Sequence, residues 1–182
     1  MKLKFKIQYL KDKYYYPTRQ YLKNIWKFRK ELSNFYDWNY DLGLFRKSIE
    51  LNKYAIEKYA NEESTSRLKK VRKMERAIYI LKCFEEDNFI ELAEKELDYK
   101  MNIGDIWFKP CKEKKGYSVM KDDLDENQKQ LNHSLIYKSK DIQNEMWKEL
   151  WSIIQGQDYD TFNKENNFQE QFDGSGLLGW WD

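Results

Sequence analysis

One apolar stripe constrains the fold of this chain more than any other feature. Its members recur at alternating spacings of three and four residues: Leu42, Phe45, Ile49, Asn52, Ile56 and Tyr59. This period is typical of an α-helix with one buried face, and it predicts a helix over 38–60 that only Asn52 interrupts. A second stripe consists of Leu68, Val71, Met74, Ile78 and Leu81. It predicts a helix over 67–86, which should pair with the first as an antiparallel hairpin.

The segments that follow have weaker but readable signals. Asn88 and Glu91 have the spacing of a capping box, in which two side chains bond reciprocally to the backbone at a helix start. They predict a helix that ends near Lys100. The helical period is lost over 105–120, where Pro110 and a glycine interrupt the chain, so a short β-hairpin or an ordered loop is expected there.

The polar segment 121–137 is expected to be mobile. A last helix is expected to begin at Ser139 or Asp141 and to stop at Gly156. Together these elements predict a mainly α, single-domain helical bundle with a central antiparallel helix pair and a short irregular or hairpin insertion. The expected parts of this domain, residues 1–182, are a basic N-terminal segment 1–36, a helical core 37–101, a loop or hairpin 102–138, and a C-terminal helix with an aromatic tail 139–182.

Composition indicates a folded protein of the reduced cytosol. Mean hydropathy is −0.99 and 35% of residues are charged, but 17% are aromatic, which supplies the buriable surface that disordered chains lack. Cys83 and Cys111 are the only cysteines, and no signal peptide precedes them, so a disulfide framework is not indicated. The longest apolar runs are far shorter than the roughly 20 residues that span a bilayer. We therefore expect a cytoplasmic protein with no membrane partner.

Charge is unevenly distributed along the chain. Residues 1–30 carry ten Lys and Arg against one Asp, a net charge of +9, whereas residues 121–182 carry a net charge of −7. The basic segment could bind nucleic acid or a membrane surface, although its lysines are spread around it, or the two ends could fold together and neutralise each other. Residues 1–14 fit either a strand or a helix, with helix slightly favoured. A further helix is expected over 19–33, after Pro17.

Catalytic chemistry is hard to build from these residues. His133 is the only histidine, which excludes multi-histidine zinc sites, and it lies in a polar segment far from either cysteine. No glycine-rich phosphate loop is present. Two acidic groups are candidates for acid/base or metal work, around Asp87 and around Asp123, but acids at a helix start and in a polar run are the simpler interpretation. The sequence therefore predicts a protein that is not an enzyme and that has no catalytic residue, no metal site and no cofactor.

A basic cluster on the second predicted helix is the candidate binding site. Its members share one face of that helix: Lys69, Arg72, Lys73 and Arg76, with Tyr79 close by. Arg72, Arg76 and Tyr79 could grip a phosphate and stack on a base, with Trp107 and Lys109 supplied by the central loop. The alternative is that the cluster is a solvated face opposite the apolar stripe.

Four short motifs resemble those of a family of uncharacterised phage-encoded helical proteins. They are Asp37-Trp38, the segment Trp107-Phe108-Lys109-Pro110, Ser118 downstream of it, and the closing Gly179-Trp180-Trp181-Asp182. The resemblance covers most of residues 35–182. Many relatives have a histidine two residues after the first tryptophan, where this chain has Tyr40, which argues against histidine chemistry for the group. The resemblance implies a phage protein made in the cytosol of a bacterial host.

This resemblance shapes the expected function, because small phage proteins without catalytic residues commonly act by occupying a host component. The first hypothesis is a non-enzymatic, anti-defence binding protein that sequesters a nucleotide-derived immune signal. The alternatives are a protein–protein inhibitor of a host defence or host-takeover target, and a nucleic-acid-binding phage protein. Sequestration predicts a small polar pocket, whereas an inhibitor predicts a flat exposed patch of Trp and Tyr. The oligomeric state stays open, and an oligomer is compatible with all three.

Overall fold

The computed structural model describes residues 2–33, 40–60, 62–112, 114–158 and 168–180. The helical elements before the hairpin are α1 (Lys2–Leu10), the π-helical turn η1 (Lys11–Tyr15), α2 (Tyr16–Lys27), α3 (Arg29–Ser33), α4 (Tyr40–Tyr59), α5 (Ser64–Glu86) and α6 (Phe89–Leu97). Strands β1 (Ile106–Pro110) and β2 (Ser118–Asp122) follow, then α7 (Glu126–Gln155), α8 (Phe168–Gln171) and the 3-10 turn η3 (Leu177–Trp180). The predicted mainly α class is confirmed, with one small two-stranded sheet.

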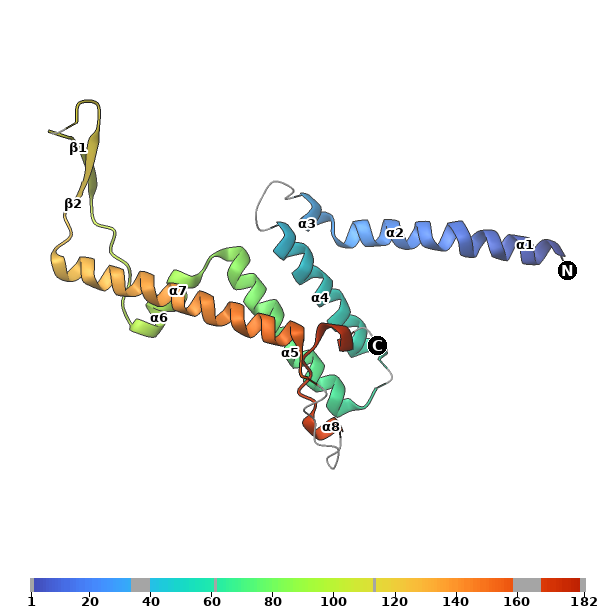
Figure 1. Ribbon diagram of the computed structural model, residues 1–182. Helices are drawn as coiled ribbons and strands as arrows, with labels where there is room; N and C mark the ends of the chain where they lie inside the picture. The colour runs from blue at the N-terminus through green and yellow to red at the C-terminus, as the bar shows by residue number, and fades with distance from the viewer. Residues whose placement is uncertain (1, 34–39, 61, 113, 159–167, 181–182) are drawn as a thin grey trace.

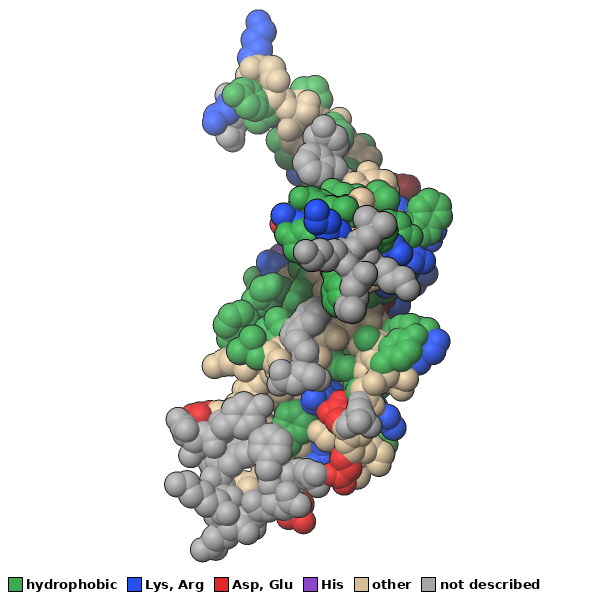
Figure 2. All heavy atoms as spheres, turned by 90° about the vertical axis from the view of Figure 1, so that its right-hand side faces the viewer, with side chains coloured by type: hydrophobic (Ala, Val, Ile, Leu, Met, Phe, Trp, Pro, Cys, Tyr) green, Lys and Arg blue, Asp and Glu red, His purple; other side chains and the backbone are tan. Residues whose placement is uncertain are grey.

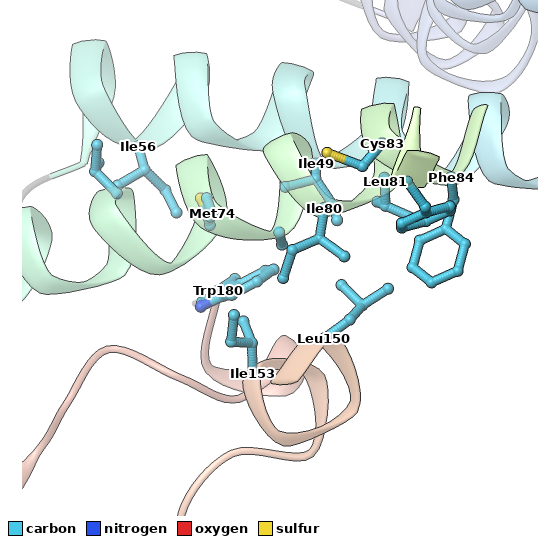
Figure 3. Packing of buried hydrophobic residues seen from close by; sticks show 13 residues of the cluster. Ile49, Ile56, Met74, Ile80, Leu81, Cys83, Phe84, Leu150, Ile153 and Trp180 are labelled. Carbon is cyan, nitrogen blue, oxygen red and sulfur yellow. The ribbon is translucent and has the colours of Figure 1, made fainter. Parts of the chain in front are cut away.

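The predicted antiparallel helix pair is confirmed as α4 and α5, which lie side by side around a common core (Figure 1). Their stripes interlock because Ile49 and Ile56 of α4 and Met74 and Ile80 of α5 are all at most 5% exposed. Figure 3 shows these side chains pointing toward one another, with Leu150 of α7 closing the cluster. Burying a side chain of this size contributes roughly 1.5–3 kcal/mol, so this cluster is the main source of stability.

The helix predicted from Asn88 exists as α6, but its start is not the predicted capping box. Asp87 ends α5 in the left-handed conformation, at φ 49°, and Asn88 follows with φ −89° and ψ 25°. That backbone is not the extended conformation from which a side chain can cap, and the Asn88 amide donates instead to Glu86 at 3.3 Å. The chain therefore passes from α5 into α6 through a tight turn.

Residues 121–137 were expected to be mobile, and this prediction is wrong from Glu126 onward. The last helix, α7, begins there and not at Ser139 or Asp141. Asp125 accepts a hydrogen bond from the Gln128 backbone at 2.7 Å, and the Gln128 side chain accepts one from the Asp125 backbone at 3.0 Å. This capping box nucleates the helix, and packing of α7 on α6 stabilises its polar first half, where Leu135 is fully buried.

The expected hairpin is present and projects from the start of α7 (Figure 1). β1 and β2 are antiparallel, and their register pairs Ile106 with Asp122 and Phe108 with Met120. Trp107 and Lys109 lie on the opposite face, since alternate residues of a strand point to opposite sides. All five β1 residues are exposed, so this two-stranded ribbon has no core of its own.

The tail after α7 returns to the core and closes it. Trp180 is 1% exposed and lies between α5 and α7 (Figure 3). Its indole N–H donates to the Gly174 carbonyl at 2.9 Å, and the Asn52 side chain donates to the Trp180 carbonyl at 3.1 Å. Asn52, the polar break in the α4 stripe, thus helps to hold the tail. Trp181, the next residue of the aromatic tail, lies outside the described residues.

The first part of the chain does not join this core. The helix predicted over 19–33 is interrupted at Phe28, whose φ of −95° and ψ of 7° end α2 before α3 begins. Glu31 of α3 lies 4.0 Å from Arg46 of α4, which also bonds to Glu85 of α5 at 2.6 Å. Beyond this anchor, α2, η1 and α1 form one rod that extends away from the body, with the N-terminus at its far end (Figure 1). Within the described residues, the basic and acidic ends therefore do not fold against each other.

Candidate functional site

The predicted cation cluster of α5 is engaged by the chain itself. The Arg76 guanidinium donates two hydrogen bonds to the Glu149 carboxylate of α7, at 2.8 and 2.6 Å. This bonding raises the pKa of Arg76 and lowers the pKa of Glu149. Lys73 forms a further ion pair with Asp173 of the tail at 2.8 Å. Both cations act as clamps that hold α7 and the tail on α5, which leaves less of their bonding capacity for a phosphate.

The other helix members of the predicted site lie next to this clamp. Tyr79 is 43% exposed, and its ring centroid is 5.2 Å from the Arg76 guanidinium carbon. Hydrogen bonding with the Cys83 side chain raises the pKa of Tyr79. Arg72 is exposed on the surface of α5. Arg76 and Tyr79 are therefore neighbours, as the helical spacing predicts.

Trp107 and Lys109 are not brought to this cluster. They stack on each other within the hairpin, with the Lys109 ammonium 5.9 Å from the Trp107 ring centroid. The hairpin leads directly into the start of α7, whereas Arg76 contacts Glu149 near its end. At 1.5 Å per residue, these two points of α7 are roughly 35 Å apart. The five residues do not form one site, because residues 126–137, which were expected to be mobile, are part of the long helix α7.

Many of the exposed large apolar side chains of the described chain lie on the N-terminal rod, defined here as residues 2–27. Every side chain from Phe5 to Lys27 is exposed. The aromatic and aliphatic residues among them are Phe5, Ile7, Tyr9, Leu10, Tyr14, Tyr15, Tyr16, Tyr21, Leu22, Ile25 and Trp26. Monomeric proteins rarely expose so many large apolar side chains together unless they bind a partner.

Basic residues accompany these rings along the whole rod. Eight Lys and Arg and one Asp lie within residues 2–27. Figure 2 looks toward the free end of the rod and shows hydrophobic and basic side chains gathered around it, while acidic side chains lie mainly toward the lower end of this face. The rod is therefore both apolar and strongly positive.

The apolar and the basic side chains of α2 lie mainly on different sides of the helix. At about 100° per residue, the ring and aliphatic side chains occupy one side of the helix, roughly 140° wide. These residues are Tyr21, Leu22, Ile25 and Trp26. Arg19, Lys23 and Lys27 occupy another side, whose mean direction is about 130° away from that of the apolar side. Trp26 is 67% exposed, and the Arg29 guanidinium carbon lies 4.3 Å from its ring centroid.

Two shallow hollows run along the rod. One, of about 550 Å³, lies along the boundary between the faces of α2 and is lined by Leu22 and Trp26 together with Lys23 and Lys27. The other, of about 790 Å³, is lined by residues of α1, η1 and the first turn of α2. Both include Tyr15, Thr18 and Arg19, so they form one continuous surface.

The basic and aromatic character of this segment was evident from the sequence, but its exposure was not. The helical period of 19–33 indicated an apolar stripe, and a stripe is normally covered by the rest of the fold. Here no described element of the body covers α2, because the helix turns away at Phe28 (Figure 1). Amphipathicity in the sequence indicates that one face of a helix is apolar, but it does not indicate what packs against that face.

Within the described ranges, no group of His, Cys, Asp and Glu is arranged to hold a metal ion. His133 is exposed on α7, with its ring centroid 6.4 Å from that of Tyr137. No described helix combines the length and the apolar character needed to cross a membrane. In comparisons with known proteins, no family model matches the chain, and neither a curated protein nor a solved structure matches it.

Proposed function

We propose that this protein is a non-enzymatic binding protein that attaches to a polyanionic surface through its N-terminal rod. One observation carries the proposal: the rod is a basic, aromatic helix whose side chains from Phe5 to Lys27 are all exposed. Positive charge at this density attracts polyanions over a distance of about 8 Å at physiological salt. The rings then add short-range contact that charge alone does not supply.

The rod is well suited to carry a partner without disturbing the core. Its contacts with the body run through α3, where Glu31 lies beside Arg46. The core is completed separately by Trp180 and the interlocked faces of α4 and α5. Binding along the rod therefore requires no rearrangement of the folded body. Following the resemblance to phage-encoded proteins, we propose that the protein acts in the cytosol of a bacterial host, against a host component.

The geometry supports the first hypothesis, nucleotide sequestration, less well than surface binding. Sequestration of a nucleotide needs cations and rings that converge on one small pocket. Arg76 is instead bonded to Glu149, and Trp107 lies in the hairpin. Calorimetry with cyclic and linear nucleotides on the native chain and on Arg72→Ala/Arg76→Ala tests that alternative directly. Nucleotide binding that the double variant loses would replace our proposal with sequestration.

Retention on immobilised heparin, a polyanion, tests the proposed function. The rod variant Arg19→Gln/Lys23→Gln/Lys27→Gln removes three charges from α2. A matched control, Lys82→Gln/Lys95→Gln/Lys148→Gln, removes three exposed charges from the body. We expect the rod variant to elute at clearly lower salt than the native chain and the control to elute close to it, because counterion release counts only the charges in contact. Equal shifts of both variants, or no retention of the native chain, would contradict the proposal.

A further inference from the structure

The separation of faces on α2 says which kind of polyanion the rod fits. We propose that the surface is an anionic lipid bilayer, on which the rod lies in the plane of the interface. This inference rests on the proposed function and names its partner. The side of α2 with Tyr21, Leu22, Ile25 and Trp26 would sink into the boundary between headgroups and acyl chains. Arg19, Lys23 and Lys27 would face the phosphates and water.

A nucleic acid uses such residues differently. It is bound by cations and rings that converge from the same side, since phosphates and bases belong to one strand in one groove. On α2 the mean directions of the cations and of the apolar residues are about 130° apart, although Arg19 lies close to Trp26 and shares a hollow with it. A nucleic acid held by Arg19, Lys23 and Lys27 would leave Tyr21 and Ile25, on the far side of the helix, in water. A bilayer engages both sides of the helix, because its interface is itself divided into an apolar and an anionic layer.

The residue types on the rod also suit this boundary. Tyrosine and tryptophan combine an apolar ring with a polar tip, and they concentrate at the level of the headgroups in membrane proteins. The rod carries five tyrosines and Trp26. Long basic side chains can lie along the apolar layer and keep their charges in water, as the mixed lining of the hollow at Leu22, Lys23 and Lys27 allows.

A second copy of the chain is a poorer occupant of the same face. Pairing two rods would bring together two segments that each carry eight Lys and Arg against one Asp. Like charges in contact disfavour such pairing. A flat bilayer can reach the rod unhindered, because the rod extends beyond the body along its whole length of about 40 Å (Figure 1). The geometry is that of a helix lying on a membrane, which is different from crossing one.

Flotation of the full-length protein with lipid vesicles tests the inference. Vesicles of equimolar phosphatidylcholine and phosphatidylglycerol are compared with vesicles of pure phosphatidylcholine. We expect the native chain to float with the anionic vesicles and to stay in solution with the neutral ones. The rod charge variant should bind the anionic vesicles roughly a hundredfold more weakly, since each basic residue near such a surface contributes about a fivefold gain.

A second variant isolates the apolar face. Leu22→Ser/Trp26→Ser removes two large exposed side chains from α2, and Leu131→Ser/Trp151→Ser removes the same residue types from exposed positions of α7. We expect the α2 pair to lower vesicle binding at least tenfold and the α7 pair to leave it unchanged. Circular dichroism of each variant verifies that the helical body is intact.

The outcomes separate the two proposals. Rod-dependent retention on heparin without flotation on anionic vesicles would overturn the lipid inference and leave the proposed function standing; binding of duplex DNA would then identify nucleic acid as the partner. A native chain that neither binds heparin nor floats with anionic vesicles would overturn both proposals. Full flotation of the α2 Leu22→Ser/Trp26→Ser variant would overturn the lipid inference, because it would mean that the apolar face does not enter the bilayer.

Discussion

Single residues in the tail determine how the core is closed. Trp180 fills the space between α5 and α7, and Gly174 supplies the carbonyl that satisfies its indole N–H. Gly174 lies against α5, where a Cβ would come within 2.3 Å of the Lys69 carbonyl carbon. Its φ of +89° is also one that side chains rarely adopt. Close approach and backbone conformation thus both require glycine at this position.

Replacing Gly174 by alanine separates these two requirements when Gly116 serves as the control. Gly116 has the same φ of +89°, but a Cβ there would meet nothing within 4 Å. We expect Gly116→Ala to cost about 1–2 kcal/mol from backbone strain alone, and Gly174→Ala to cost clearly more because the tail must lift from α5. Urea unfolding followed by circular dichroism measures both values. Equal losses would mean that the tail does not press on α5.

At the scale of elements, α7 connects the two ends of the body. Its first half packs on α6, and its second half packs on α5, where Arg76 bonds to Glu149. The hairpin projects from its start, so the position of Trp107 and Lys109 depends on where α7 begins. That start is set by the capping box of Asp125 and Gln128.

Removing the cap should weaken this first half of the helix. Asp125→Ala leaves the Gln128 backbone N–H without its partner, and we expect a loss of about 1 kcal/mol in the free energy of unfolding. Asp141→Ala is the control, because Asp141 lies exposed in the middle of the same helix and alanine is the better helix former there. Chemical denaturation of both variants provides the comparison. The capping assignment would be wrong if Asp125→Ala were as stable as the native chain.

On the scale of the whole molecule, the structure divides into a body with a continuous core and two projections without one. The body is held by α4, α5, α7 and the tail. The rod and the hairpin expose their apolar side chains instead. This division places the buried core in the body and much of the exposed apolar surface on the projections.

Hydrogen exchange should reveal this division in the free protein. Most helical stability in proteins comes from packing of an apolar face, and the rod has no such packing within the described residues, so we expect its amides to exchange well before those of α5. Mass spectrometry of exchanged peptides, repeated at two protein concentrations, measures the difference. Protection of the rod equal to that of α5, increasing with concentration, would mean that a second copy covers it and that the rod is not free to bind a surface.

Local pattern was enough to predict α4 and α5, and it placed a hairpin or an ordered loop where the hairpin forms. A helix period or a run bounded by proline and glycine acts through near neighbours in the chain. The single histidine likewise limits the chemistry that the sequence allows. The beginning of α7 was predicted wrongly, because its first half has few apolar residues and depends on packing against α6 and on the cap at Asp125. The spacing of Asp125 and Gln128 is readable in the sequence as a capping box, but Asn88 and Glu91 have the same spacing and form no such cap.

Contacts between segments far apart in the chain could not be predicted from the sequence. Arg76 and Tyr79 share a helix face and were correctly predicted to be neighbours, but the carboxylate that occupies Arg76 comes from a residue 73 positions away. The length of α7 separates Trp107 from them. The apolar face of α2 was visible in the sequence, whereas its exposure depends on the direction in which the chain leaves Phe28. Periodicity reports which side of a helix avoids water, and only the path of the whole chain determines whether anything covers that side.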